Sequence, residues 1–304
     1  MSDLPKACVV VLNYNGTKDT ADCIESLQNL NYPDFKILLV DNASKDKSWK
    51  EILKKYPLVS VLENDRNLGY AGGNNAGIRW ALKSGFEDVF ILNNDTLVDS
   101  QALLLLETFS LGNPKATILG PKVLSYGAQP FIHSLGTSMD WFRLRPRISF
   151  YGRSETEGGS KPRPMPIIPG SALLLKNRLL SKGGFFNEDF FLIHEDADLC
   201  LRNLREGYLN MVVPEARVFH KESRTMASYP YLRNYYSVRN FLYLCGAYAN
   251  FFEKVMAFTG LCLLCIKNTG IFFFADLKKK EASRGFFKGA WDFVMRRKGP
   301  RVLP

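Results

Sequence analysis

The sequence predicts an α/β protein in which a single, mostly parallel sheet is flanked by helices and followed by a separate helical extension. Two observations predict the sheet. Short apolar runs alternate with segments of helical spacing through about residue 120, and three apolar runs end abruptly at acidic residues. A third observation predicts the extension: the net charge of +10 lies wholly in residues 215–304, since residues 1–214 carry equal numbers of acidic and basic side chains. A basic segment of this kind points to an anionic partner.

The expected elements follow in order along the chain. Short apolar runs predict strands at 7–12, 36–40, 59–62, 89–92 and 171–176. Helical spacing predicts helices at 19–30, 47–55, 74–84, 100–110 and 232–248. Between residues 120 and 169 the pattern is irregular, and the proline-rich segment 156–166 predicts a loop. We therefore expect an α/β domain over residues 1–228, with halves at about 1–120 and 121–228, and a basic helical extension over 229–304.

The apolar runs that end in acid predict where the chemistry lies. After the third run, Glu195, Asp196 and Asp198 place three carboxylates within four positions, and the other two runs lead to Asp41 and Asp95. The carboxyl ends of strands in an open α/β sheet line one crevice, where ligands bind. Acids gathered there repel one another unless a cation or a proton-transfer task retains them. The pattern indicates a metal-dependent enzyme that acts on a phosphorylated substrate.

Each motif also has a simpler interpretation. The polar residues 41–46 suit an Asx-turn and a helix cap as well as a contact to a pyrimidine ring. The Gly/Asn-rich segment 67–75 suits a phosphate loop, although it lacks the dinucleotide fingerprint. Residues 93–96 offer hard oxygens to Mg²⁺ or Mn²⁺, or a capped turn. One acid of the 195–198 group is explained by a helix N-terminus, but three exceed that need. His220 follows an apolar run and is either structural or a neutral metal ligand.

Taken in order, these motifs resemble the family 2 glycosyltransferases of the GT-A fold. The resemblance covers about residues 6–245 and depends on Val9–Gly16, Val40–Ser44, Asn67–Asn75, Leu92–Thr96 and Gly184–Leu199. It is greatest to the bacterial rhamnosyltransferase-like branch, which builds lipid-linked or cell-wall polysaccharides. The resemblance implies that residues 1–120 form the nucleotide-binding, donor half of a catalytic domain and residues 121–228 its acceptor side.

The resemblance also implies a set of site residues. Asp196 is expected to be the catalytic base, with Glu195 orienting the site or contacting the acceptor, and Asp95 and His220 are expected to bind Mg²⁺ or Mn²⁺. The donor nucleotide is expected to lie against Asn13, Asp41, Asn67, Gly69, Asn74 and Asn94. One departure concerns residues 93–95, which read Asn-Asn-Asp where many relatives carry Asp-x-Asp. A single carboxylate implies weaker metal binding.

The predicted reaction is inverting transfer of a sugar, with L-rhamnose as one candidate. The donor would be dTDP- or UDP-linked, and the acceptor a hydroxyl of a glycan or of a polyprenyl-diphosphate-linked saccharide. Two alternatives remain open: a nucleotidyltransferase of related fold, and a catalytically inactive sugar-nucleotide-binding protein recruited to a membrane. We expect no nucleic-acid partner.

The irregular segment predicts the acceptor side. Trp141, Arg143 and Arg145 belong to a basic-aromatic stretch that suits sugar faces and a diphosphate, unless it is merely a solvated loop.

The basic tail predicts attachment to a membrane. Residues 255–266 and 271–275 are apolar, but Lys267 interrupts them, and a span needs ~20 consecutive apolar residues. We interpret Cys262 and Cys265 as one turn of a buried helix. Residues 286–294 form an apolar helical face between basic clusters, the pattern of a helix lying on an anionic surface. We therefore expect a peripheral protein on the cytoplasmic face of the cell membrane. The alternatives are a tail that folds back on the catalytic domain, one that pairs subunits in a homo-oligomer, and a true span.

Overall fold

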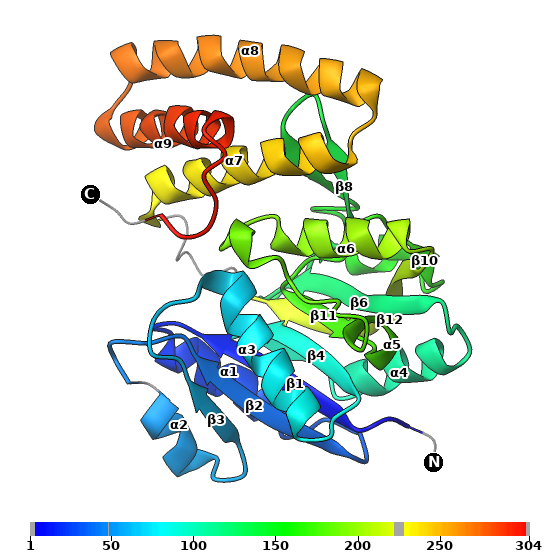
Figure 1. The fold of residues 1–304 in the computed structure, drawn as a ribbon. Coiled ribbons are helices and arrows are strands. Elements are labelled where there is room, and N and C mark those ends of the chain that lie inside the picture. Colours follow the sequence, from blue (N-terminus) through cyan, green and yellow to red (C-terminus); the bar gives the residue numbers. More distant parts are fainter. Residues whose placement is uncertain (1–3, 48, 222–227, 302–304) are drawn as a thin grey trace.

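The computed structural model describes residues 4–47, 49–221 and 228–301. An α/β body built on one sheet carries a stack of three helices, α7 to α9, at one end (Figure 1). The strands are β1 (Ala7–Asn13), β2 (Phe35–Asp41), β3 (Ser60–Glu63), β4 (Asp88–Asn93), β5 (Thr96–Val98), β6 (Ala116–Ser125), β7 (Ile132–Ser134), β8 (Thr137–Asp140), β9 (Arg145–Ile148), β10 (Arg163–Pro164), β11 (Ala172–Leu175) and β12 (Leu209–His220).

The sheet has the strand order β10-β12-β6-β11-β4-β1-β2-β3, with β5 paired to β12 and β7 paired to β6. Strands β4, β1, β2 and β3 are parallel to one another, as are β6 and β12. Between these two groups, β11 runs antiparallel to both of its neighbours. The start of β11 therefore lies beside the end of β4, which gives the carboxyl edge of the sheet a segment from a distant part of the chain.

Helices cover both faces of the sheet. They are α1 (Thr17–Leu27), α2 (Trp49–Lys55), α3 (Gly69–Lys83), α4 (Ala102–Leu111), α5 (Asn177–Leu180), α6 (Glu195–Arg205), α7 (Pro230–Tyr248), α8 (Phe251–Phe274) and α9 (Leu277–Val294). Helices α3, α5 and α6 bury apolar side chains against one face, and α1, α2 and α4 against the other. The predicted strands and helices of the first 120 residues are all present.

The Gly/Asn-rich segment differs from the expected loop because it forms the first turns of α3. Its glycines let the helix lie close to the sheet. A Cβ atom at Gly73 would stand 2.5 Å from Leu12 Cδ1, and one at Gly77 would stand 2.6 Å from Val10 Cγ1. Apolar packing therefore explains these two glycines without a bound anion.

Two predictions for the second half are wrong. The region from 120 to 169 is not irregular throughout, since it contains part of β6 and the β8–β9 hairpin. The acid-tipped run 190–193 is not a strand. A short 3₁₀ turn (Glu188–Phe190) precedes it, and Phe191, Ile193 and His194 all have positive φ angles. Tertiary contacts hold this loop in a conformation that its apolar composition does not favour.

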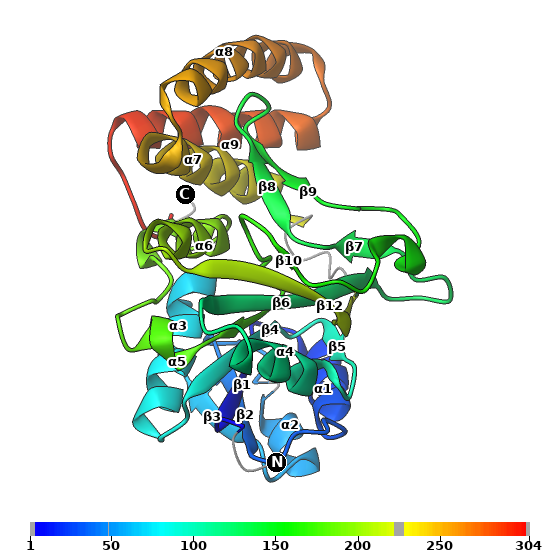
Figure 2. The same ribbon diagram turned by 90° about the vertical axis from the view of Figure 1, so that its right-hand side faces the viewer.

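The extension forms a helical stack with its own apolar core. Helices α7 and α9 pack along one another, and α8 lies across them (Figure 2). The apolar face predicted for residues 286–294 is largely turned inward: Phe286 is 3% exposed, and Phe287 and Ala290 pack beside it, while Trp291 and Val294 remain exposed. The tip of the β8–β9 hairpin reaches into the same core through Leu144.

Candidate active site

The predicted acidic residues meet at the carboxyl edge of the sheet. Asn13 and Asp41 end β1 and β2, and Asp95 follows β4. Asp196 reaches the same edge through β11, because its Oδ2 accepts a 2.8 Å hydrogen bond from the N–H of Gly170, just before that strand. Asn93 at the end of β4 donates its backbone N–H to Ser171 O at 3.0 Å, which joins the two segments.

The end of the edge formed by β1 and β2 is a closed hydrogen-bond network. The amide of Asn13 donates to Asp41 Oδ1 at 2.8 Å and accepts from the Thr20 hydroxyl at 2.8 Å. Asp41 Oδ2 accepts the N–H of Ser44 at 2.9 Å. Both Asn13 and Asp41 are fully buried. These contacts fix the turn that follows β2, and the predicted contact of Asp41 with a pyrimidine ring stays a prediction.

The remaining predicted donor residues surround this network. Asn67 Oδ1 accepts the N–H of Gly69 at 2.8 Å, and Gly69 has a φ angle of +72°. A Cβ atom at Gly69 would stand 2.3 Å from Phe191 O, so only glycine fits there. Asn74 is fully buried and donates to Tyr70 O at 3.0 Å, and Asn94 donates to the Thr20 hydroxyl at 2.9 Å. These four residues therefore make structural contacts beside the network, and their predicted contacts with a donor nucleotide stay predictions.

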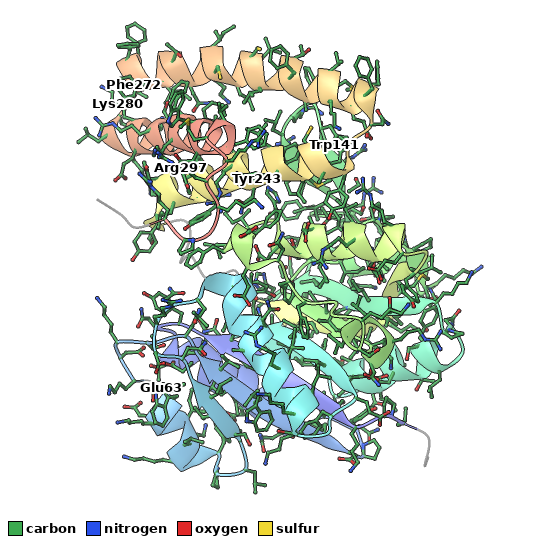
Figure 3. The ribbon with its side chains drawn as sticks, in the orientation of Figure 1. Glu63, Trp141, Tyr243, Phe272, Lys280 and Arg297 are labelled. Carbon is green, nitrogen blue, oxygen red and sulfur yellow. The ribbon has the colours of Figure 1, made fainter. Side chains whose placement is uncertain are left out.

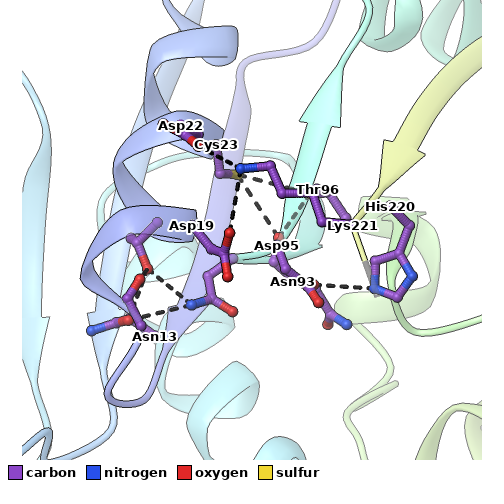
Figure 4. Close-up of polar contacts among 12 residues, drawn as sticks. Asn13, Asp19, Asp22, Cys23, Asn93, Asp95, Thr96, His220 and Lys221 are labelled. Carbon is purple, nitrogen blue, oxygen red and sulfur yellow. Dashed lines mark hydrogen bonds and ion pairs between the residues drawn. The ribbon is translucent and has the colours of Figure 1, made fainter. Parts of the chain in front are cut away.

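Asp95 and His220 lie together although 125 positions separate them. In the antiparallel pairing of β5 with β12, His220 stands opposite Thr96, which brings His220 Nε2 to 3.1 Å from Asp95 Oδ1 (Figure 4). Lys221 anchors the same strand end: its backbone N–H donates to Asp95 O, and its ammonium group contacts Asp19 and Asp22 of α1. Both Asp95 and the ring of His220 are mostly buried.

The Asp95–His220 pair fits a divalent cation. Two cis ligands of an octahedral ion at 2.0–2.1 Å lie about 3 Å apart, which matches the separation found here. A carboxylate oxygen with an imidazole nitrogen suits Mn²⁺ at least as well as Mg²⁺. Two side chains leave most coordination positions to be filled by a substrate. Among the described residues, no group of three or more His, Cys, Asp or Glu side chains is arranged to hold an ion.

The sequence did not single out His133, which lies beside this pair. Its ring, on β7, meets the ring of His220 edge-to-face with centroids 5.2 Å apart, and Tyr151 lies 5.8 Å from it on another side. The only signal in the sequence is that the chain contains three histidines, and all three lie at or near this site.

The acid pair Glu195–Asp196 lies at the N-terminus of α6. Asp196 is half-buried, and its two oxygens accept N–H groups from Gly170 and Ala197. Glu195 is buried, and burial together with the neighbouring Asp196 charge raises its pKa to about 8. Burial also raises the pKa of Asp196. The backbone donors favour the ionised form at Asp196, so the proton that the pair retains near neutral pH belongs on Glu195.

Tyr70 of α3 connects the sheet edge near Asp95 with the segment that binds Asp196. Burial raises the pKa of its phenol, and the Glu195, Asp196 and Asp95 carboxylates raise it further. Its hydroxyl donates to Gly170 O, whose residue in turn binds Asp196. A side chain of α3 therefore supports the segment that binds Asp196, the predicted base.

Helix α7 holds the loop that carries the acid pair. Asn240 donates to the carbonyl oxygens of Phe190, Leu192 and Ile193 at 2.7–3.0 Å. The guanidinium of Arg239, 1% exposed, donates to the carbonyls of Asp189, Phe190 and Gly299. These bonds stabilise the left-handed residues just before Glu195, so the extension contributes directly to the site.

A cavity of about 170 Å³ adjoins Asp196. Its walls come from the α6 terminus, from His133 and Pro169, and from the β8–β9 hairpin. His194 lines it, and burial lowers the pKa of that imidazole to about 4, so the ring is neutral at pH 7. Within the part of the chain that the structure describes, His194 Nε2 and Glu195 Oε2 are buried without a hydrogen-bond partner. His194 is one of the residues that line the cavity, whereas Glu195 is not.

The predicted acceptor residues lie on the hairpin. Arg143 pairs with Asp140 at 3.0 Å, and Arg145 and Arg147 are exposed along β9. Arg143, Arg145 and Arg147 line a hollow of about 480 Å³. This hollow adjoins the cavity, since Pro146 and Ile148 border both. Trp141 instead packs against Phe241 of α7, with ring centroids 5.4 Å apart. Its main contact here is with the helical stack.

This arrangement is that of a sugar-nucleotide transferase fold, and comparison with known proteins identifies the family. The model of glycosyl transferase family 2 matches residues 8–182. The chain belongs to this family.

Two curated relatives agree. A low-salt glycan biosynthesis hexosyltransferase from Haloferax volcanii is 24% identical over 66% of this chain, which spans 62% of that relative's length. An N-acetylglucosaminyl-diphospho-decaprenol L-rhamnosyltransferase from Mycobacterium tuberculosis is 25% identical over 73% of this chain and 78% of its own length. The predicted resemblance to the rhamnosyltransferase-like branch is confirmed.

Solved structures confirm the GT-A fold. GalNAc-T7 with UDP, GalNAc and Mn²⁺ matches 98% of this chain and 59% of its own, with a TM-score of 0.67 and 14% identity. A mannosyltransferase from Pyrobaculum calidifontis with GDP-Man and Mn²⁺ matches 97% of this chain and 89% of its own, with a TM-score of 0.59 and 16% identity.

Proposed function

We propose that this chain is an inverting glycosyltransferase that moves a sugar from a nucleoside-diphosphate donor to a hydroxyl of a lipid-linked saccharide. The observation that carries the proposal is that Asp196, the predicted base, lines a cavity at the same sheet edge as the Asp95–His220 pair. The rhamnosyltransferase relative favours transfer of L-rhamnose, and a dTDP-rhamnosyl transferase from Shigella flexneri, 22% identical to this chain, favours a dTDP-linked donor. A UDP-linked hexose is our alternative.

In the proposed reaction Asp196 acts as general base. It takes the proton of the acceptor hydroxyl as the oxygen attacks the anomeric carbon, and the bond from that carbon to the diphosphate breaks with its electrons on the leaving oxygen. The N–H groups of Gly170 and Ala197 keep Asp196 ionised and aimed into the cavity. Protonated Glu195 and neutral His194 supply hydrogen bonds that orient the acceptor.

Asp95 and His220 would hold Mg²⁺ or Mn²⁺. When bound, such an ion neutralises the charge that grows on the departing diphosphate. The chain contributes a carboxylate and an imidazole already at the required spacing, fixed by the β5–β12 pairing and by Lys221. His133 packs against His220 and would restrict how the imidazole turns.

The acceptor would divide between the two hollows beside β9. The cavity of about 170 Å³ beside Asp196 is of the size of a single sugar ring, while the arginine-lined hollow suits a diphosphate. Such an acceptor is typical of polyprenyl-linked intermediates, and a site of action at the cytoplasmic face of a membrane is therefore part of the proposal. Residues 1–228 would then be the catalytic domain, and the extension from 229 would brace its acid pair.

Donor turnover tests the proposal. Purified protein with Mn²⁺ is incubated with a panel of dTDP- and UDP-sugars, and release of the nucleoside diphosphate is measured. We expect slow release from one donor and an increase when a lipid-linked saccharide is added. Pyrophosphate formed from a sugar phosphate and a nucleoside triphosphate would instead support a nucleotidyltransferase. Donor binding without release from any combination would support an inactive binding protein.

A further inference from the structure

The outer side of α8 is an apolar face that no described residue covers. Side chains on this side project away from the rest of the helical stack (Figure 3). The exposed fraction is 84% for Phe251, 67% for Phe258 and 70% for Ile266. With Val255, Leu263 and Phe273 they recur at helical spacing along the whole helix, and we call this set the outer stripe. A continuous apolar stripe of this length on a folded protein indicates an interaction surface.

Basic residues flank the outer stripe. Lys254 and Lys267 are exposed and lie along its two edges, as their spacing of 13 positions requires on an α-helix. Residues 278–280 add three lysines at the start of α9. Long basic side chains at the border of an apolar face can keep their charge at the level of phosphate groups while the face enters the acyl region.

We propose that α8 lies in the plane of an anionic phospholipid membrane, with the outer stripe inserted below the headgroups. This assignment deepens the proposed function, because a lipid-linked acceptor would be met at that surface. The surface differs from the one that the sequence suggested: α9 buries most of its apolar face against α7, whereas α8 presents its own outward.

The path of the chain favours a helix in the plane over one that crosses the bilayer. By length and composition α8 qualifies as a span, with 24 residues and a mean hydropathy of 1.6. A crossing helix would leave α7 and α9 on opposite sides of the membrane, yet these two helices pack along one another. The inner side of α8 is also committed to protein, since Ser283 donates to Asn268 O at 2.7 Å.

The same inner side contacts the β8–β9 hairpin. Gly260 lies directly against the backbone of Phe142, so closely that a Cβ atom there would overlap it. The hairpin therefore runs from the proposed membrane helix to the cavity beside Asp196. A saccharide on a lipid diphosphate could stay anchored in the membrane while its sugar reaches the base.

Vesicle binding tests the assignment. Full-length protein is floated with phosphatidylcholine vesicles that contain or lack phosphatidylglycerol. We expect binding to the anionic vesicles that weakens at high salt, and extraction by alkaline carbonate. Phe258→Glu with Ile266→Glu should weaken binding by at least about tenfold, and Lys254→Gln with Lys267→Gln by roughly fivefold for each lysine.

Two matched pairs serve as controls. Leu58→Glu with Leu111→Glu adds the same charges at exposed leucines of the α/β body, and Trp291→Glu with Val294→Glu adds them on α9. Both pairs should bind vesicles much as the wild type does. A polarity-sensitive fluorophore on Cys262, which is exposed on α8, should shift to the blue on binding in a Cys265→Ser background.

Three results would overturn the assignment. The variant Phe258→Glu with Ile266→Glu could bind vesicles as well as the wild type does. The wild-type protein could resist extraction by carbonate, as a protein with a spanning helix would. The same double variant could do no more than convert a dimer into a monomer, as measured by light scattering. Thermal unfolding establishes that each variant is folded. Donor turnover without vesicles is measured in parallel, so a failure of membrane binding is distinguishable from a failure of the proposed transferase activity.

Discussion

The two ends of the active-site edge differ in how far their polar side-chain atoms are hydrogen-bonded within the protein. At the end formed by β1 and β2, Asn13, Asp41 and Asn42 use their polar atoms on one another and on nearby backbone groups. At the other end, His194 Nε2 and Glu195 Oε2 are buried without partners among the described residues. The polar atoms of Asn13, Asp41 and Asn42 are thus engaged within the protein, although Asn74 Oδ1 beside them is buried without a partner among the described residues. A buried polar group left unsatisfied costs stability, and we propose that the acceptor supplies the missing partners of His194 and Glu195.

Substitution of the proposed base, Asp196, should have the largest effect on the rate of sugar transfer. Asp196→Asn keeps the shape and the N–H contacts of the side chain but removes its capacity to accept a proton. We expect sugar transfer to fall by ~10²–10⁴-fold while donor affinity is retained. Rates are compared with Asp34→Asn, an exposed carboxyl on the opposite edge of the sheet. Transfer within a few-fold of the wild type would remove Asp196 from this role.

Substitution of the Asp95–His220 pair should have the second-largest effect. Loss of an outer-shell partner alone typically weakens metal affinity by ~10–100-fold, and Asp95→Ala removes a proposed ligand outright. Titration calorimetry should show that Mn²⁺ tightens nucleoside-diphosphate binding to the wild type and to Asp99→Ala, but not to Asp95→Ala. Unchanged affinity and turnover in a chelator would contradict the metal assignment.

The support from α7 can be tested by Asn240→Ala. This change leaves the carbonyls of Leu192 and Ile193 without the Asn240 donor, while Phe190 O keeps its bond from Arg239, and it should lower the free energy of unfolding by about 1–3 kcal/mol. Because the loop positions Asp196, kcat should fall by about tenfold with little change in donor KM. Asn234→Ala on the same helix removes a bond to Ala282 O and serves as the control. An equal loss of kcat in both variants would show that helix stability alone matters.

The arginine-lined hollow beside β9 predicts a smaller effect, confined to the acceptor KM. Arg143→Glu with Arg145→Glu should raise the acceptor KM by roughly fivefold or more, since each guanidinium would lose a phosphate contact. Donor hydrolysis without acceptor should not change. Lys50→Glu with Lys54→Glu on α2 makes the same charge change elsewhere. A change confined to the donor parameters would move the acceptor away from the hairpin.

Glu195→Gln should have the smallest effect on rate, because an amide resembles the protonated acid. The folded chain holds the Glu195 proton up to about pH 8, whereas the unfolded chain releases it near 4.5. The folded state therefore binds more protons in that window, so its free energy of unfolding falls as pH rises from about 4.5 to 8, by at most about 1.4 kcal/mol per pH unit.

Denaturant titrations across this range measure that slope, and Glu195→Gln should flatten it while transfer at neutral pH stays within a few-fold. A large loss of transfer would instead show that Glu195, not Asp196, carries the reacting proton.

Local sequence pattern determined the structure of the first 120 residues of this protein. Strands β1 to β4 are short apolar runs that alternate with helical spacing, and each parallel strand places its terminal residues at one edge. Asp41 and Asp95 could therefore be assigned to that edge without coordinates. Four of the five family motifs lie in these residues, and together with Gly184–Leu199 they predicted the fold and the class of enzyme.

Only the tertiary structure decided what depends on pairing between distant segments. The register of β5 with β12 sets His220 beside Asp95, and antiparallel β11 brings Gly170 to Asp196. Asn240 imposes positive φ angles on a loop whose composition suggests a strand. The apolar faces of α8 and α9 also differ in what covers them, since α9 packs its apolar face against α7 and α8 leaves its outer stripe exposed. Helical periodicity shows that a face exists, but what covers that face depends on contacts that the sequence does not record.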